Sequence, residues 1–454
     1  MFEARPDWHA VLLPALPEPD ISDLALPVEI IPELKKHARE LLKIDSELYA
    51  SKNLSSTSSH RFLSTIMSSG TLSDKVSALT LVVQESPVHT VKSFESLLAL
   101  AKKRSRGQAV TALGAIKDLL GAGVVLPPDR RLRHFESQPG LLGTLQANPI
   151  RNWKSGDALP GPIANAHMVS WAYEDWLKET YFDVLKVLEA WCNDEVVYAR
   201  GRAVTYVYEL LREKPEQESN LLRLLVNKLG DPDKKIASRA SYLILQLQTT
   251  HPLMKLIIIR AIETELLLRS GQSSHAKYYA INTLNQTILS GKEEDVARKL
   301  LSVYFDLFVT LLKKADPPTS VTGPLVNRKG QVQGGGGKMG KRSREKAKRE
   351  DIKQQGSDES TEKMISAVLT GVNRAFPFAK SNDSTYETWT PVRIILLTFY
   401  SQARTAHERA LQNNTFIELQ YEYSSSNAHT AALHIKASCR GPVLSDTLRV
   451  ALRL

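Results

Sequence analysis

The chain has 454 residues, of which 42% are hydrophobic and 24% charged, a composition that predicts a folded, water-soluble protein with a large buried core. No apolar run approaches the roughly 20 residues that a membrane-spanning helix needs, and the first residues lack the layout of a secretory signal, so we expect an intracellular protein with no membrane partner. The formal net charge of +10 indicates polyanionic partners.

The first 32 residues are rich in proline and acidic groups, and they predict an extended lead-in rather than core. Apolar residues at helical spacing then predict a helix over Glu33–Ala50. Two later helical patterns share the sequence Val-x-Ala-Leu, at residues 76–79 and 110–113. The helix between them ends in the basic run Lys102–Arg106, which is either a solvated turn or an RNA contact.

A tandem repeat dominates the centre of the chain. In each copy an apolar helical pattern is followed by a polar turn carrying Asp, and then by a second apolar pattern with a buried-looking Arg-Ala pair. In the second copy, Gly230 suits a left-handed C-terminal cap and Asp231 can cap the next helix. At an offset of 37 residues, Leu185 aligns with Leu222, Asp194 with Asp231, Arg202 with Arg239, and Ala203 with Ala240.

A pair of such helices cannot bury its apolar faces alone, so the repeat predicts a stack of pairs. The predicted fold is all-α, a HEAT/armadillo-like α-solenoid with a disordered basic insertion and irregular termini. Two unrelated amphipathic hairpins that align by chance are the alternative.

Residues 316–360 lack apolar periodicity and are too polar to offset the entropic cost of ordering, which predicts a disordered basic insertion. Between Arg328 and Lys353, ten basic residues against three acidic ones give a net charge of +7 (10 − 3). These cations could direct nuclear import alone, or import together with contact to the RNA backbone. The candidate residues are Lys338, Lys341, Arg342, Arg344, Lys346, Lys348 and Arg349.

Together these patterns predict seven segments. They are a proline-rich lead-in (1–32), N-terminal helical repeats (33–120), a linker (121–165), central HEAT-like repeats (166–315), the insertion (316–360), the start of a C-terminal helical block (361–400) and an atypical tail (401–454).

No catalytic constellation emerges from the sequence. The stretch Gly335–Arg342 resembles a phosphate-binding loop, but Arg342 stands where Ser or Thr should reach magnesium. The cysteines and histidines match no metal-ligand spacing. Acidic pairs such as Glu174-Asp175 are expected at helix starts or exposed turns, where they complement the helix dipole. We therefore expect a protein that is not an enzyme and has no cofactor and no metal.

Several long motifs resemble the CCAAT-binding-factor/maintenance-of-killer (CBF/MAK) family. They lie at residues 62–75, 211–217, 222–231, 277–286 and 371–379, and the likeness covers about residues 30–395. From about Arg404 the tail lacks the apolar helices that family members have there.

The resemblance implies a HEAT-type scaffold of the nucleus and nucleolus that serves assembly and export of the large (60S) pre-ribosomal subunit. Its implied partners are a second nucleolar complex (Noc) protein in a heterodimer, the pre-ribosomal particle with its pre-rRNA, and, through the basic run, a nuclear import receptor.

The alternative function is a transcription cofactor that binds CCAAT DNA. The sequence contains no recognition helix accompanied by zipper heptads, zinc ligands or a homeodomain-like pattern. A third class, nuclear transport receptors, conflicts with a chain that carries its own basic signal.

Overall fold

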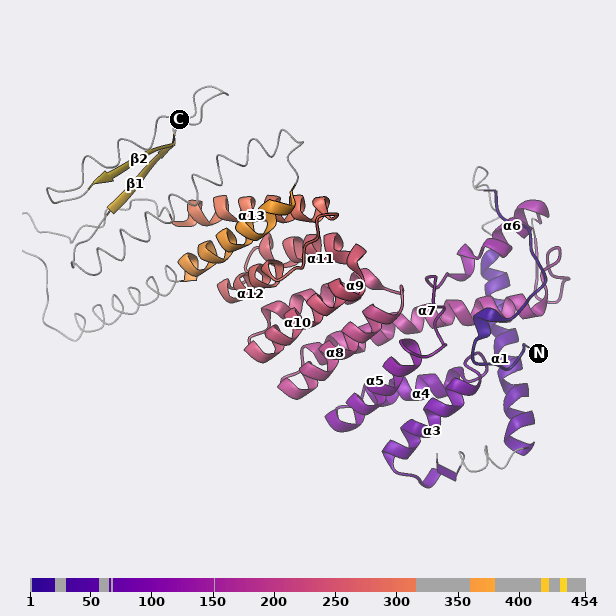
Figure 1. The fold of residues 1–454 in the computed structure, drawn as a ribbon. Helices are drawn as coiled ribbons and strands as arrows, with labels where there is room; N and C mark the ends of the chain where they lie inside the picture. Colours follow the sequence, from indigo (N-terminus) through magenta and orange to yellow (C-terminus); the bar gives the residue numbers. More distant parts are fainter. Residues whose placement is uncertain are drawn as a thin grey trace, which may run out of the picture. The chain divides into compact units, whose positions relative to one another are not determined.

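The computed structural model describes residues 2–20, 30–56, 65–66, 68–150, 152–315, 360–379, 418–423 and 433–438. They belong to two units, residues 1–289 with 305–367 and residues 290–304 with 368–454. The α-helices are α1 (Ile31–Ser56), α3 (Leu72–Glu85), α4 (Val91–Ala101), α5 (Arg106–Leu120), α6 (Pro139–Ala147), α7 (Asn165–Cys192), α8 (Val197–Glu213), α9 (Glu218–Asn227), α10 (Lys234–Thr250), α11 (Lys255–Ile262), α12 (Ser274–Asn285) and α13 (Glu294–Ala315), with further helical residues at 360–375 (Figure 1).

The predicted all-α class is confirmed for this helical body, and the predicted helix at Glu33–Ala50 lies within α1. Two short strands outside the body were not predicted. β1 (Glu418–Tyr423) pairs antiparallel with β2 (Leu433–Ser438), so that Glu418 lies opposite Ser438. None of the described helices combines the length and the apolarity that crossing a bilayer requires.

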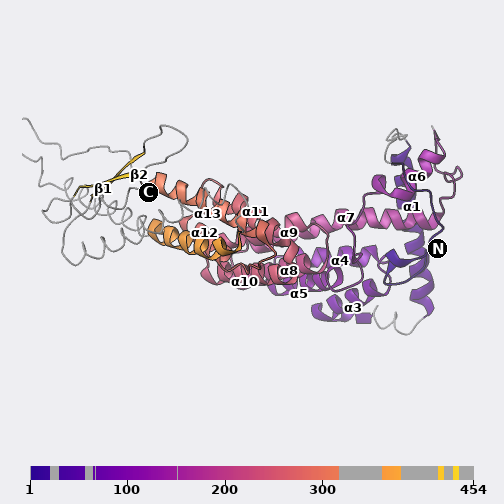
Figure 2. The same cartoon turned by 45° about the horizontal axis from the view of Figure 1, so that its top comes forward.

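Helices of the first unit pack in two rows. In one row α5 contacts α8, α8 contacts α10 and α10 contacts α12, while in the other α9 contacts both α7 and α11. Helix α8 packs on both α7 and α9 and so joins the rows. Helix α1 crosses the N-terminal half of the long helix α7 (Figures 1 and 2). These contacts are consistent with the predicted α-solenoid.

The repeated Arg-Ala pair is only half buried. Ala203 and Ala240 are 1% and 0% exposed, as expected of small residues where helices approach closely. Arg202 and Arg239, however, are exposed, so the prediction of a buried pair is wrong for the arginines. Neighbouring residues on a helix point about 100° apart, which turns each arginine away from the interface that its alanine occupies.

The turn of the second copy is capped differently from the prediction. Asp233 caps α10 by accepting a hydrogen bond from the Lys235 amide (2.8 Å). Asp231 is instead buried and pairs with Arg200 of the preceding helix pair (3.3 Å). Gly230 has no left-handed backbone; a Cβ there would lie 3.1 Å from that of Ala276, so this glycine allows close packing.

The lead-in is extended but belongs to the core, which contradicts the prediction. Trp8 is 2% exposed and donates a hydrogen bond from Nε1 to the carbonyl of Val125 (2.9 Å). The Phe2 amide donates to buried Asp45 (2.7 Å). A Cβ at Gly143 of α6 would lie 2.1 Å from the Pro17 carbonyl oxygen, so only glycine fits there.

The linker also contains structure that the prolines did not reveal. Helix α6 lies within residues 121–165, and a short 3-10 helix, Phe135–Ser137, precedes it. The Phe135 side chain is fully buried, and so is Leu141. Proline is compatible with the first turn of α6 because N–H groups in a first turn have no intrahelical acceptor, so the N–H that proline lacks costs no hydrogen bond.

Gly271 connects α11 to α12 with a φ of +82°, and this is a position where glycine is required. We expect Gly271→Ala to lower the free energy of unfolding by about 1–2 kcal/mol, because a side chain disfavours this backbone conformation. Chemical denaturation followed by circular dichroism measures the effect. The matched control is Gly107→Ala in the first turn of α5, where a Cβ meets nothing within 4 Å. It should stabilise the protein slightly, and destabilisation of similar size in both variants would contradict the explanation.

Candidate nucleic-acid interface along helix α7

Helix α7 contains two adjacent buried carboxylates, Glu174 and Asp175, which are 2% and 0% exposed. The prediction that this pair lies at a helix start or an exposed turn is wrong, because α7 begins well before it, at Asn165. Near that end, His167 accepts the Ala164 amide at Nδ1 (3.0 Å), and its Nε2 lies 3.0 Å from the Pro14 carbonyl oxygen of the lead-in.

Glu174 holds the linker segment 130–138 against α7. Its carboxylate accepts hydrogen bonds from the Arg133 backbone amide (2.9 Å) and the Gln138 side chain (3.0 Å). It also forms a bidentate ion pair with the Arg130 guanidinium. A buried carboxylate is stable only when its oxygens are satisfied in this way, so the segment and the helix depend on each other.

Asp175 joins the same segment to α1. It accepts a hydrogen bond from the Phe135 amide (3.2 Å) and pairs with Lys35 and Arg39 of α1, each at 3.0 Å. Burial by itself raises the pKa of the Asp175 carboxyl, but the hydrogen bonds from Lys35 and Phe135 outweigh it, so that the pKa lies below its usual value. Asp175 is therefore a charged link between α1, α7 and the linker at neutral pH.

His134, Glu136 and Asp175 bring their ligand atoms within 4.8 Å of one another, a spacing that could hold a metal ion. The Lys35 ammonium group already lies 3.1 Å from Glu136 and 3.0 Å from Asp175. It supplies the positive charge that a metal would bring. The donor set therefore fits an ion-pair cluster better than a metal site.

Two hollows of about 730 and 500 Å³ adjoin beside α7, and a third of about 700 Å³ is lined by α1 and Glu136; together we call them the α7 groove. Arg39 lines the α1 hollow and bonds Glu179, which lines the larger hollow beside α7 (3.1 Å). Lys102, Asp183 and Lys186 line both hollows beside α7. The Arg39–Glu179 pair thus links the α1 hollow to the two hollows that follow α7 to the α4–α5 turn.

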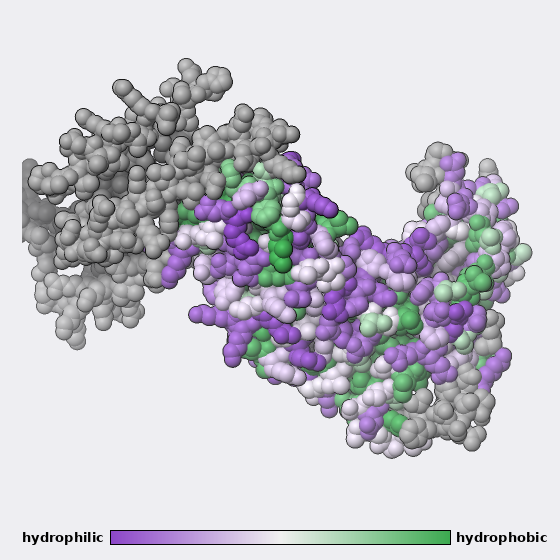
Figure 3. Space-filling view, in the orientation of Figure 1, coloured by the Kyte–Doolittle hydropathy of each residue, from purple (hydrophilic) through white to green (hydrophobic). Residues whose placement is uncertain are grey.

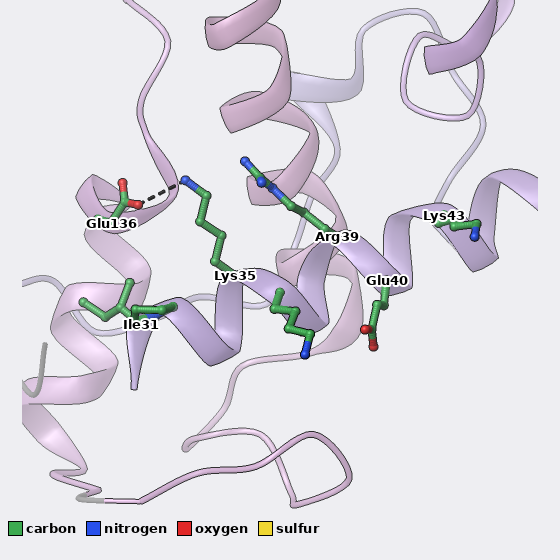
Figure 4. A pocket seen from close by; sticks show the side chains of 8 residues that line it. Ile31, Lys35, Arg39, Glu40, Lys43 and Glu136 are labelled. Atoms are coloured by element: carbon green, nitrogen blue, oxygen red, sulfur yellow. Dashed lines mark hydrogen bonds and ion pairs between the residues drawn. The ribbon is translucent and has the colours of Figure 1, made fainter. Parts of the chain in front are cut away.

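The α1 end of the groove is basic. Lys35 and Arg39 extend from α1 in the same direction, and Lys35 reaches Glu136, whereas Glu40 extends from the opposite side (Figure 4). Lys36 and Lys43 are exposed, and no described carboxylate forms an ion pair with either. These two lysines supply charge that the fold does not neutralise.

The other end carries the basic run Lys102–Arg106, which lies on an exposed turn as predicted. Arg106 pairs with Asp194 (3.0 Å), whereas Lys103 and Arg104 have no carboxylate partner among the described residues. Between the two ends, Phe182 is 46% exposed beneath the Lys186 ammonium group (4.8 Å to the ring centre). Unpaired cations at both ends of a groove suit a polyanion such as nucleic acid.

The predicted phosphate-contact and import residues lie elsewhere. All seven, Lys338, Lys341, Arg342, Arg344, Lys346, Lys348 and Arg349, fall outside the described residues. The α1 cations were not predicted as part of a site. Their signal was Lys36, Arg39 and Lys43 on one side of an amphipathic helix, a pattern that is equally typical of a solvated face.

Ser86, His89 and Asp45 are arranged in the order of a hydrolase triad, but all three are buried. Ser86 Oγ lies 2.7 Å from His89 Nδ1, and His89 Nε2 lies 3.4 Å from Asp45. Burial lowers the pKa of His89 and so favours the neutral ring, although the nearby Asp45 acts in the opposite direction. Since Asp45 also accepts the Phe2 amide, the cluster anchors the lead-in.

Comparison with known proteins finds relatives whose names refer to ribosome biogenesis, CCAAT binding or the nucleolar complex. The chain is 52% identical over 388 residues to a protein of Chaetomium thermophilum named Ribosome biogenesis protein NOC1, a match that covers 85% of this chain and 36% of the relative. It is 35% identical over 359 residues to human CCAAT/enhancer-binding protein zeta, covering 79% of this chain and 29% of that protein. Nucleolar complex protein 1 of Drosophila melanogaster matches 262 residues at 29% identity, covering 58% of this chain and 21% of that protein.

The chain therefore spans about a third or less of the length of these relatives. No protein-family model matches it.

Proposed function

This chain belongs to the CBF/MAK family of nucleolar complex proteins, and we propose that it acts in the nucleus and nucleolus as a non-enzymatic scaffold for ribosome biogenesis. More specifically, it would bind the large-subunit precursor, a Noc-type partner protein and pre-rRNA. The observation that carries the proposal is the match over 85% of the chain to a relative named for ribosome biogenesis. The α7 groove supports it, because its unpaired cations suit an RNA backbone.

Affinity purification tests the assembly role. The full protein that contains this chain should retain large-subunit ribosomal proteins, precursor RNA and a Noc-type protein, as identified by mass spectrometry and RNA sequencing. Retention of promoter-bound transcription factors in place of ribosomal proteins would contradict the proposal. A tagged nucleolar protein of unrelated function serves as the control for abundant ribosomal background.

Within this proposal, the basic insertion assists import and contacts the RNA backbone. Deleting residues 334–353 removes eight basic and three acidic residues, a net loss of +5 (8 − 3). We expect several-fold less crosslinking to pre-rRNA and weaker nucleolar retention, with an unchanged helical circular dichroism signal. A deletion variant fused to an independent nuclear import signal separates the two roles. If that fusion crosslinks as well as the wild type, the segment serves import alone.

A second candidate, the CCAAT-binding transcription cofactor, is favoured by the name of the human relative. A binding assay at physiological salt compares a CCAAT duplex with a scrambled duplex of equal length. Equal affinities support the assembly scaffold, since backbone contacts carry no sequence information. A clear preference for CCAAT supports the cofactor.

A further inference from the structure

The exposed arginines of the tandem repeat belong to a larger surface on α8, α10 and α12. Helices α10 and α12 contain no Asp or Glu, and the first carboxylate in α8 is Glu209, in its C-terminal half. The exposed cations are Arg202, Lys234, Lys235 and Arg239. The acidic side chain nearest to these cations on the three helices is therefore Glu209, which interacts with Arg202 but pairs with Lys117 of α5 (2.6 Å).

Among the described residues, no carboxylate forms an ion pair with the four cations of this surface. Arg202 donates to the Tyr206 hydroxyl (2.9 Å), and Arg239 donates to the Thr205 hydroxyl (3.0 Å), both of which are neutral. No described carboxylate forms an ion pair with Lys235. The surface thus differs from the α7 groove, where carboxylates neutralise several of the cations.

Each of the three helices also carries one exposed tyrosine, and Tyr198 interacts electrostatically with Arg202. Tyr198 of α8 is 67% exposed, Tyr242 of α10 is 59% exposed and Tyr278 of α12 is 37% exposed. The rings of Tyr198 and Tyr242 are mostly exposed, whereas that of Tyr278 also packs edge-on against Tyr279 (6.5 Å between ring centres). We call Tyr198, Tyr242, Tyr278 and the four cations the tyrosine face.

The three helices hold the tyrosine face together. The Arg239–Thr205 hydrogen bond joins α10 to α8, and Thr283 of α12 donates to Ser241 of α10 (2.8 Å). All three helices belong to the first unit, and side chains over the region of α8 and α10 are largely hydrophilic (Figure 3). The spacing of the tyrosines is therefore set by packed helices instead of by a loop.

Cations alone would suit any polyanion, and the tyrosines decide between them. In an RNA duplex the bases are already stacked, so exposed rings would find only the sugar-phosphate backbone. An acidic peptide pairs with cations but offers no flat ring systems. Single-stranded RNA offers both phosphates for the cations and unstacked bases for the tyrosines.

We propose that the tyrosine face binds single-stranded RNA, with Tyr198, Tyr242 and Tyr278 stacking on bases while Arg202, Lys235 and Arg239 contact phosphates. The surface shares no residue with the α7 groove. RNA binding by the tyrosine face does not depend on the role in ribosome biogenesis, since the binding can be measured on the purified full chain. Failure of the purification experiment would therefore leave this inference untouched.

The test measures binding of the full chain to a fluorescent oligouridylate of about 15 nucleotides. Stacking contributes about 1–3 kcal/mol per base, so Y198A/Y242A/Y278A should weaken binding at least about 25-fold if two of the three tyrosines stack. Y198F/Y242F/Y278F should bind within a few-fold of the wild type, because phenylalanine keeps the ring. An RNA duplex of the same length should lose far less affinity with the alanine variant.

Three results would overturn the proposal. One is unchanged oligouridylate affinity in the alanine variant. The second is an equal loss in the alanine and phenylalanine variants when both remain folded by circular dichroism. The third is that polyglutamate binds as tightly as oligouridylate and that its affinity falls equally in the alanine variant. That result would indicate an acidic protein partner. Should the triple alanine variant not fold, Tyr242→Ala against Tyr242→Phe gives the same comparison.

Discussion

Replacing Asp175 with alanine should lower the free energy of unfolding by about 3–5 kcal/mol. The fully buried carboxylate pairs with Lys35 and Arg39 and accepts the Phe135 amide. Its removal leaves the buried Phe135 N–H without its acceptor and leaves Lys35 only the exposed carboxylates Glu136 and Glu179. Chemical denaturation measures the loss. Hydrogen exchange should report it first as local opening of the linker segment.

Asp183→Ala is the matched control, since this carboxylate lies on the same helix but is about half exposed and pairs with exposed Lys186. Its loss should cost less than about 1 kcal/mol. Asp175→Asn keeps the shape and one acceptor, and we expect an intermediate loss. Equal effects of the Asp175 and Asp183 alanine substitutions would refute the importance of burial at this position.

The Asp175 contribution should also depend on pH in one direction. Its folded pKa is lowered, so the stabilisation is complete above the unfolded value of about 3.9 and is lost as the pH falls through the folded pKa. The difference between wild type and Asp175→Ala should be constant from neutral pH down to about pH 5 and shrink below about pH 4. A difference that persists unchanged in stronger acid would mean that the charge of Asp175 is not what stabilises the fold.

Reversing charge at the α4–α5 turn should have the largest effect on RNA affinity. In K102E/K103E/R104E, three cations at one end of the α7 groove become carboxylates. For single-stranded RNA, the negative slope of log affinity against log salt should become shallower by about 2, since each phosphate contact contributes about 0.7. Fluorescence anisotropy over a salt series measures both affinity and slope.

The matched control is R269E, which reverses the charge of an exposed arginine outside both proposed surfaces. Its counterpart in the groove is the single reversal K103E. A salt slope that falls as much in R269E as in K103E would show that net charge alone governs binding. A triple variant that binds RNA like the wild type would remove the α7 groove as an interface. Duplex and single-stranded RNA should both weaken here, in contrast to the tyrosine variants.

Periodicity predicted the helices well because the apolar side chains that pack each helix into the core recur at regular spacing within one short stretch of sequence. The helix at Glu33–Ala50 and the two helices of each repeat copy were found in this way. Capping was harder, because Asp231 and Asp233 are both suitable residue types. Only the packed structure shows that Asp231 is needed by Arg200.

Sequence patterns failed where distant segments satisfy one another. Glu174 and Asp175 look like surface carboxylates until the linker supplies an arginine and backbone amides to pair with them. Trp8 lies in a proline-rich stretch, and its hydrogen-bond partner Val125 is 117 residues away in sequence. The α7 groove combines α1, α4 and α7 and could not be predicted from any one of them.

The length of α7 has a mechanical consequence. Its 28 residues form a rod of about 42 Å at 1.5 Å per residue, which packs against α1 and the linker in its N-terminal half and against the neighbouring helices α8 and α9. The unpaired cations at the two ends, Lys36 and Lys43 on α1 and Lys103 and Arg104 at the α4–α5 turn, are thereby kept a fixed distance apart. On the proposed role, a nucleic acid contacts both groups only when its contour spans that distance, and a shorter fragment keeps the contacts of one end alone.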